Sequence, residues 1–195
     1  MTQNPPNLVE LRTIFEEIVS ADSRAADIID RLRTMLRRGH VALQPVNVNE
    51  SIEELLQLTR TDLHRRAVTV TKDTAPDLPP ALTDRVQLQQ VLLNLIMNAC
   101  EAMRTNPPED RVLTLTTVTT EDQVHIGVLD IGVGLPDDLE SLFQPFHSTK
   151  EGGLGMGLSI CRTLMASQGG KLWPERRAGR GAAFYLALPL ARQDS

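Results

Sequence analysis

Residues Asp84–Met103 read DRVQLQQVLLNLIMNACEAM, a stretch with the pattern of a largely buried helix. Its apolar residues fall on nearly all sides of a helical wheel, which indicates packing against several neighbours. Asn94, Asn98 and Glu101 are spaced i, i+4 and i+7, so a helix places them on one face. Because a buried amide without partners costs about 1–3 kcal/mol, this face contacts either a polar ligand, such as a metal ion, or water and a neighbouring loop.

Composition narrows the class of protein. The 195 residues are 41% hydrophobic and 23% charged, which is ordinary for a globular domain with an appendage. A net charge of -5 without a basic block argues against nucleic-acid binding. Cys100 and Cys161 lack metal-ligand spacing and indicate buried thiols in a reducing compartment. No apolar run approaches the roughly 20 residues of a membrane span and no signal peptide opens the chain, so we expect a soluble, cytoplasmic protein.

The N-terminal part has a different periodicity. Between Leu8 and Leu36 apolar residues alternate by three and four, the seam of a bundle or coiled-coil helix, broken once at Asp22. One helix cannot bury such a seam alone. A second copy of the chain, helices absent from it, or folding back onto the domain would have to cover it. We therefore predict two domains, a helical region over 1–44 and a larger domain over 45–195.

The larger domain has alternating helical and strand patterns. Helices are predicted over 52–66, 84–103 and 158–167, and strands over 68–72, 111–119, 124–130, 171–174 and 183–189. These elements predict an α+β fold, a two-layer sandwich of about three helices on a mixed, mostly antiparallel five-stranded sheet, preceded by one long bundle helix.

A carboxylate with two glycines follows the second hairpin strand, in Asp130-Ile131-Gly132-Val133-Gly134. Glycines allow close approach of a flat ligand, and a carboxylate at a strand end can accept from an exocyclic amine. Taken alone, the same five residues also describe an ordinary turn.

A long irregular segment then runs from Gly134 to Gly157 and is expected to be a functional lid. It contains Phe143, Phe146 and the sequence HSTK at 147–150, and it ends with GGLGMG at 152–157, directly before a helix. Free N–H groups and the helix dipole at such a helix start favour an anion. The alternative is a flexible hinge with a glycine cap.

In this order, the four features resemble the N, G1, F and G2 boxes of the catalytic domain of sensor histidine kinases, part of an ATPase superfamily that includes gyrase, mismatch-repair ATPases and a heat-shock chaperone. The resemblance covers Pro45–Leu190, and the wording GMGLSICRTLM and PFHSTK is most similar to the nitrogen-regulation and nitrogen-fixation sensor branch. It implies binding of ATP or ADP with Mg²⁺, transfer of the γ-phosphoryl to histidine on an acceptor helix, and a response regulator downstream.

The resemblance also implies roles for individual residues. Asn98 matches the Mg²⁺ ligand, Asn94 would contact phosphate or metal-bound water, and Asp130 matches the carboxylate that accepts from the adenine amino group. Gly132 and Gly134 would give the base room. The other expected nucleotide contacts are Glu101, Thr149, Lys150, Gly153, Leu154, Gly155, Met156, Gly157 and Leu158. Lys150 is a candidate γ-phosphate contact and, with Asn94, a candidate catalytic residue. The phenylalanines of the lid are expected to hold it against the domain body or the helical bundle.

Two departures from the family matter for function. Asn94 stands where the ATPase relatives carry a catalytic Glu, and an amide cannot act as a base, so fast ATP hydrolysis is not expected. None of the four histidines, His40, His64, His125 and His147, has the surroundings of the phosphoacceptor. The acceptor is therefore expected on another polypeptide segment. The Leu8–Leu36 helix would be the second helix of the dimerisation bundle and could pair two copies. The alternative functions are a nucleotide-binding or dimerisation module without phosphotransfer, and a slow ATPase.

Overall fold

The computed structural model describes residues 42–145 and 155–191. The predicted Leu8–Leu36 helix, its pairing between copies, and the contacts of Thr149, Lys150, Gly153 and Leu154 lie outside this part and stay predictions. The domain boundary at 44/45 depends on that helix and stays a prediction as well.

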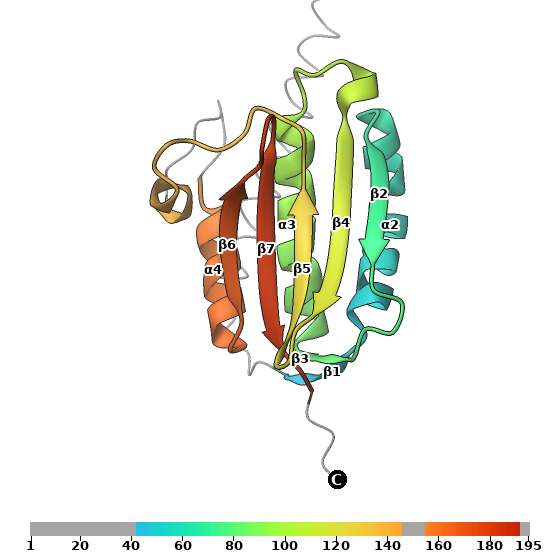
Figure 1. The fold of residues 1–195 in the computed structure, drawn as a ribbon, viewed down its shortest axis with the longest axis vertical. Coiled ribbons are helices and arrows are strands. Elements are labelled where there is room, and N and C mark those ends of the chain that lie inside the picture. Colours follow the sequence, from blue (N-terminus) through green and yellow to red (C-terminus); the bar gives the residue numbers. More distant parts are fainter. Residues whose placement is uncertain (1–41, 146–154, 192–195) are drawn as a thin grey trace, which may run out of the picture. The chain divides into compact units, whose positions relative to one another are not determined.

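Three helices cover one face of a five-stranded sheet, as predicted (Figure 1). The helices are α2 (Val48–Arg65), α3 (Arg85–Ala102) and α4 (Gly157–Ser167). The strands, in their order across the sheet, are β2 (Thr69–Thr74), β4 (Val112–Thr119), β5 (Gln123–Leu129), β7 (Ala182–Pro189) and β6 (Lys171–Arg176). Only β2 and β4 run parallel, so the sheet is mixed and mostly antiparallel.

The core lies between the sheet and α3. Alternate residues of the central strands point toward the helices and are buried, which is the period-2 pattern of a strand with one covered face. The fully buried large side chains include Leu88, Leu92, Leu95, Ile96, Leu113, Leu115, Ile126, Leu186 and Leu188. Because α3 contributes four of these nine, it is the central helix of the layer.

One predicted helix boundary and several short elements differ between the sequence-based prediction and the structure. Helix α2 begins at Val48, four residues before the predicted start, because the Asn47 side chain caps it by accepting from the Glu50 N–H at 3.1 Å. A small second sheet pairs β1 (Gln44–Val46) with β3 (Ala81–Thr83). Two 3₁₀ turns, η1 (Pro108–Asp110) and η2 (Glu140–Phe143), complete the described part.

Gln168 ties the end of α4 to the start of α3. This side chain is only 2% exposed, and its Oε1 accepts from the Thr83 hydroxyl at 2.5 Å and the Asp84 N–H at 2.8 Å. Its Nε2 donates to the Leu164 carbonyl at 2.9 Å. Asp84 itself caps α3 by accepting from the N–H groups of Val86 and Gln87. One buried amide thus fixes the α3 N-terminus against α4.

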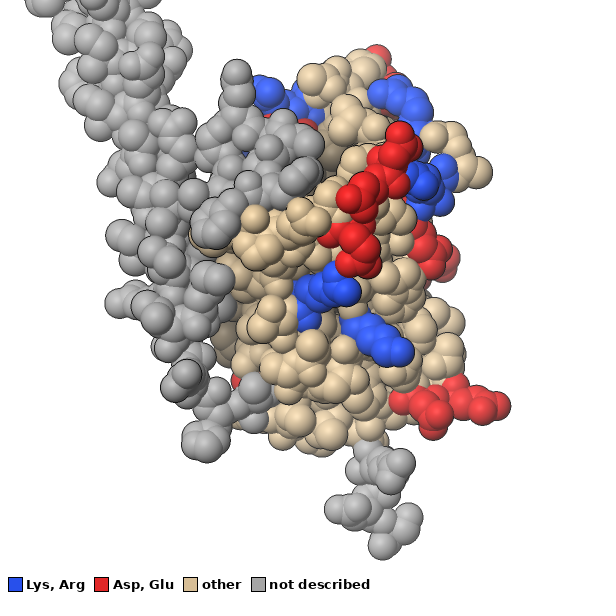
Figure 2. All heavy atoms as spheres, turned by 90° about the vertical axis from the view of Figure 1, so that its left-hand side faces the viewer, with Lys and Arg blue, Asp and Glu red and all other residues tan. Residues whose placement is uncertain are grey.

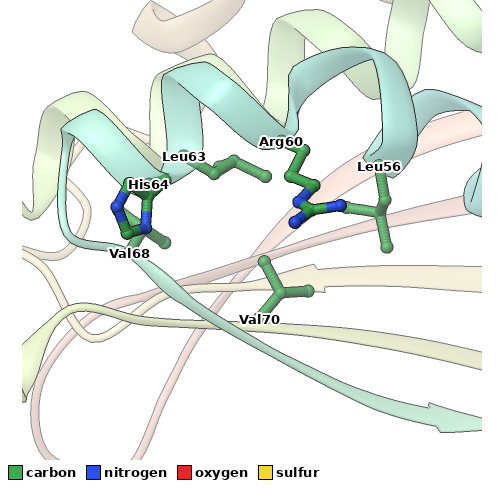
Figure 3. Close-up of a pocket in the computed structure, with 6 residues that line it drawn as sticks. All are labelled: Leu56, Arg60, Leu63, His64, Val68 and Val70. Carbon is green, nitrogen blue, oxygen red and sulfur yellow. The ribbon is translucent and has the colours of Figure 1, made fainter.

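A cavity of about 270 Å³ lies between α2 and the edge strand β2 (Figure 3). In this view Leu56 and Arg60 extend from the helix toward the strand, and Val70 extends from the strand toward the helix. The full lining is Leu56, Arg60, Leu63, His64, Val68 and Val70. The cavity contains none of the predicted nucleotide contacts, which lie on α3, on the N-terminal part of α4 and on the segments that follow β5.

Candidate functional site

Asp130 directly follows β5 and is 3% exposed. Its Oδ1 accepts from the Gly132 N–H at 2.7 Å and from the Ala182 N–H at 3.3 Å. Burial raises the pKa of this carboxyl above its ordinary value, although the two backbone donors and Arg177 act in the opposite direction. No described residue donates to Oδ2, so one carboxylate oxygen is fixed by the backbone and the other is available to a ligand.

The turn between β6 and β7 contacts the backbone carbonyl of Asp130. The Arg177 guanidinium donates to the Asp130 carbonyl at 2.8 Å. Gly181 has φ +94°, and a Cβ placed on it would lie 1.9 Å from the same carbonyl oxygen. A side chain at position 181 is therefore excluded both by the backbone conformation and by the close approach to Asp130.

Asn106 holds the next peptide of this loop. The side chain is 3% exposed, and its Nδ2 donates to the Ile131 carbonyl at 2.9 Å and to the Asp110 carbonyl at 3.0 Å. Its Oδ1 accepts from Arg180 at 2.9 Å. The sequence reading did not identify Asn106, Arg177 or Arg180. The only local signal nearby is the pair of glycines at 179 and 181, which indicates no more than a turn.

The loop after Asp130 rests on the last turn of α3. The Val133 N–H donates to the Ala102 carbonyl at 3.2 Å, and a Cβ on Gly132 would lie 2.5 Å from that oxygen. Asn98 lies one helical turn before Ala102 and is half-buried. The structure thus joins the two features that the sequence predicts to form one site, the amide-bearing helix and the glycine-flanked carboxylate.

The other amide of α3 faces the start of α4. Asn94 donates from Nδ2 to the Cys161 sulfur at 3.3 Å. A Cβ on Gly157 would lie 2.6 Å from Asn94 Oδ1, so the α4 backbone approaches this amide directly. Among the described residues no side chain caps α4, since Met156 stands at its N-cap without a side-chain hydrogen bond. An uncapped helix start beside an amide is a suitable place for an anion.

Among the described glycine-box residues, Gly155 has φ +64°, Met156 is buried and Leu158 is half-buried in the first turn of α4. Gly134 has φ +82°, which accounts for glycine at that position. These residues belong to the same two segments, at the α4 start and the loop after β5.

Glu101 differs from the two amides because its carboxylate is already paired. It lies 3.0 Å from Arg104 and 3.7 Å from Arg66, which follows the last turn of α2. These partly exposed pairs add little stability, but they hold the carboxylate toward α2. A nucleotide contact through Glu101 stays a prediction, and its observed partners favour a structural role.

Residues 135–145, the described first part of the segment after Gly134, contact α4 and β6. Phe143 of η2 is buried, and the Arg162 guanidinium of α4 lies 4.7 Å from its ring centroid. Arg162 also donates to Glu140 at 2.8 Å. On the edge strand, Arg176 donates to the carbonyls of Pro136 and Asp137. On this α4 and β6 side of the molecule basic and acidic side chains are interspersed (Figure 2), and their ion pairs anchor the first part of the expected lid to the domain body.

A family model for histidine kinase-, DNA gyrase B- and HSP90-like ATPases matches residues 83–192. The chain belongs to this ATPase family. It is 34% identical over 190 residues to the sensor histidine kinase TmoS of Ectopseudomonas mendocina, covering 96% of this chain and 20% of TmoS. It is 35% identical over 190 residues to the sensor protein FixL of Bradyrhizobium diazoefficiens, covering 97% of this chain and 37% of FixL. The chain therefore spans between one fifth and two fifths of these relatives.

Solved structures agree with this assignment. The nucleotide-free catalytic domain of the histidine kinase ThkA is 32% identical, with a TM-score of 0.68 over 76% of this chain and 95% of that domain. ThkA in complex with the response regulator TrrA gives a TM-score of 0.73 at 25% identity, over 97% of this chain and 53% of ThkA. The resemblance to the sensor-kinase catalytic domain is thus confirmed, whereas the nitrogen-regulation branch stays a prediction.

In the part of the chain that the structure describes, no helix has both the length and the apolar character that crossing a bilayer requires.

Proposed function

We propose that this chain binds Mg·ATP and transfers the γ-phosphoryl group to a histidine outside the chain, as the catalytic part of a sensor histidine kinase. The observation that carries the proposal is the packing of the Gly132 loop on the last turn of α3. This contact brings the buried Asp130 carboxylate next to the helix that presents Asn94 and Asn98.

Asp130 Oδ2 would accept from the adenine amino group, while Oδ1 is held by two backbone N–H groups. This division suits an exocyclic amine, which only donates, and disfavours guanine, whose corresponding atom is an acceptor. The uncapped start of α4 would bind phosphate oxygens through its N–H groups.

Mg²⁺ fits the chemistry of the helix face. It prefers oxygen ligands and commonly takes one or two from protein, with phosphates and water supplying the rest. Asn98 would hold the ion through its amide oxygen, and the ion would neutralise charge on the phosphates. Asn94 lacks the basicity to activate water. This favours phosphoryl transfer to an imidazole, which is itself a nucleophile, rather than hydrolysis of ATP.

The relatives suggest the partners. ThkA has been solved with the response regulator TrrA, and we infer that the phosphoryl group passes from the acceptor histidine outside this chain to a regulator of that kind. Pairing of two copies through Leu8–Leu36, and a cytoplasmic location, are further parts of the proposal.

Thermal unfolding with and without Mg·ATP tests binding. Millimolar Mg·ATP or Mg·ADP is expected to raise the melting temperature of the wild type, because a ligand that binds only the folded state stabilises it. Asp130→Asn and Asn98→Ala should abolish the rise. Asp122→Asn, an exposed carboxylate in the β4–β5 turn, is the matched control and should keep it. An unchanged wild-type melting temperature at millimolar nucleotide contradicts the proposal.

Phosphotransfer needs a separate measurement. Labelled ATP is incubated with the chain and an acceptor-helix peptide of a sensor kinase, and acid-labile phosphohistidine is quantified. Nucleotide binding without phosphohistidine would favour the binding-module alternative. Phosphate release faster than about 1 per second, a low enzymatic rate, would favour an ATPase.

A further inference from the structure

We propose that Cys161 is a positioning residue that sets which way the Asn94 amide points. The proposal rests on the function above, since it concerns the amide that would contact phosphate or metal-bound water, and it adds a residue that the motifs do not assign.

The first step is the contact itself. Cys161 lies in the second turn of α4, is 2% exposed, and its sulfur accepts from Asn94 Nδ2 at 3.3 Å across the α3–α4 interface. A carboxamide has one donor end and one acceptor end of nearly the same shape. Without a fixed partner, rotation by a half turn exchanges the two ends with little steric change.

The second step is the consequence for the acceptor end. With Nδ2 on the sulfur, Asn94 Oδ1 faces Gly157, the first residue of α4, where a Cβ would lie 2.6 Å away. The oxygen therefore lies beside the start of α4, where it can accept from a metal-bound water but not from a phosphate oxygen, which has no proton to donate. A reversed amide would present its NH₂ group at that place and its oxygen to the sulfur.

The third step is that this thiol is suited to the task. A thiol is a weak acceptor and also a weak donor, and in this structure the sulfur takes the donor end of the Asn94 amide. The other cysteine, Cys100, also lies in a helix and is also 2% exposed, and no nucleotide contact is predicted for it. It serves as the matched control.

The test measures the Mg·ADP dissociation constant by calorimetry. Cys161→Ala is expected to weaken binding about fivefold, the size of effect that loss of one neutral hydrogen bond gives. Cys161→Ser, which keeps an acceptor, and Cys100→Ala should stay within about twofold of the wild type. In an Asn94→Ala background, Cys161→Ala should have no further effect, because a residue that acts through Asn94 loses its influence when that side chain is removed.

A second measurement does not depend on nucleotide binding. In the nucleotide-free protein, the ¹H–¹⁵N signals of the Asn94 side-chain amide should move in Cys161→Ala and change less in Cys161→Ser. The proposal would be overturned if Cys161→Ala weakened Mg·ADP binding equally in the wild-type and Asn94→Ala backgrounds. It would also be overturned if the Asn94 side-chain signals did not change in Cys161→Ala. A wild type that binds no nucleotide, with Asn94 signals that still respond to Cys161→Ala, would refute the proposed function and leave the positioning role supported.

Discussion

Gly181 lies so close to the carbonyl oxygen of Asp130 that a Cβ on it would be 1.9 Å from that oxygen. The β6–β7 turn and the loop after β5 thus share a backbone contact that no side chain can enter. The carboxylate of Asp130 is held by the same pair of segments, since Oδ1 accepts from Ala182, the residue after Gly181.

Two glycines of this turn provide a matched pair. Both Gly179 and Gly181 have positive φ, +98° and +94°, but a Cβ on Gly179 would meet nothing within 4 Å. Gly179→Ala should cost only the backbone strain, about 1 kcal/mol. Gly181→Ala adds a clash with backbone and should cost at least about 3 kcal/mol. Urea denaturation measures the free energy of unfolding of both variants. Equal decreases would show that the close approach of residue 181 to Asp130 does not affect stability.

Asp130 should make stability depend on pH in a defined direction. Burial raises the pKa of its carboxyl above the ordinary value of 3.8, so the folded state binds the proton more tightly than the unfolded state does. Its contribution to stability is full below 3.8 and is lost as the pH rises through the higher folded value. Asp130→Asn does not titrate, and its amide oxygen can accept both backbone N–H groups.

Relative to Asp130→Asn, the wild type is therefore expected to lose free energy of unfolding as the pH rises from 3.8 toward neutrality. Urea denaturation of both proteins at several pH values gives the difference. A difference that stays constant, or that grows in favour of the wild type as the pH rises, would contradict burial as the dominant influence on this carboxyl.

Gly157→Ala should separate stability from binding. The three atoms nearest to a Cβ at Gly157 all belong to the Asn94 side chain, which can move aside. Alanine is favoured over glycine by roughly 1 kcal/mol in a helix interior and by less at this first position. The gain offsets part of the crowding, so the melting temperature should change little. Displacement of Asn94 should weaken Mg·ADP binding by roughly tenfold, as loss of a contact to a charged group does. Calorimetry measures the Mg·ADP affinity of this variant. An affinity equal to that of the wild type would show that Asn94 does not contribute to the binding site.

Gln168→Ala should destabilise the fold without a direct effect on nucleotide contacts. It leaves the Thr83 hydroxyl and the Asp84 N–H without their partner, while the Leu164 carbonyl still accepts from Ser167, and we expect a loss of about 2–4 kcal/mol. The exposed Gln57 of α2 is the control, and Gln57→Ala should change stability by less than about 0.5 kcal/mol. Similar losses for the two variants would mean that the Gln168 bridge contributes no stability.

Local patterns predicted most of the architecture because the information is local. The boundaries of α3, Arg85–Ala102, agree within one residue with the predicted 84–103. The five strands of the main sheet begin and end within two residues of their predicted bounds. The β1 and β3 strands were missed because three residues are too short for a period to be recognised.

The supporting contacts of the site were not predictable in this way. Asn106, Arg177 and Arg180 hold the loop after β5 through partners 25, 47 and 74 residues distant in sequence. Helical spacing predicted that Glu101 lies on the same face as the two amides. It could not predict that Arg66, at the end of α2, forms an ion pair with the Glu101 carboxylate. Such pairings are determined by the tertiary fold and produce no periodic pattern in the sequence.

The single parallel pair of the sheet has a consequence for how the chain folds. Thr69 of β2 lies opposite Val112 of β4, and the chain between them includes the whole of α3. An antiparallel hairpin such as β4–β5 can form from neighbouring residues, whereas this edge must wait until the crossover helix has docked. The amides of β2 should accordingly exchange with solvent before those of β5 and β7, and local opening of the molecule should begin at the β2 edge.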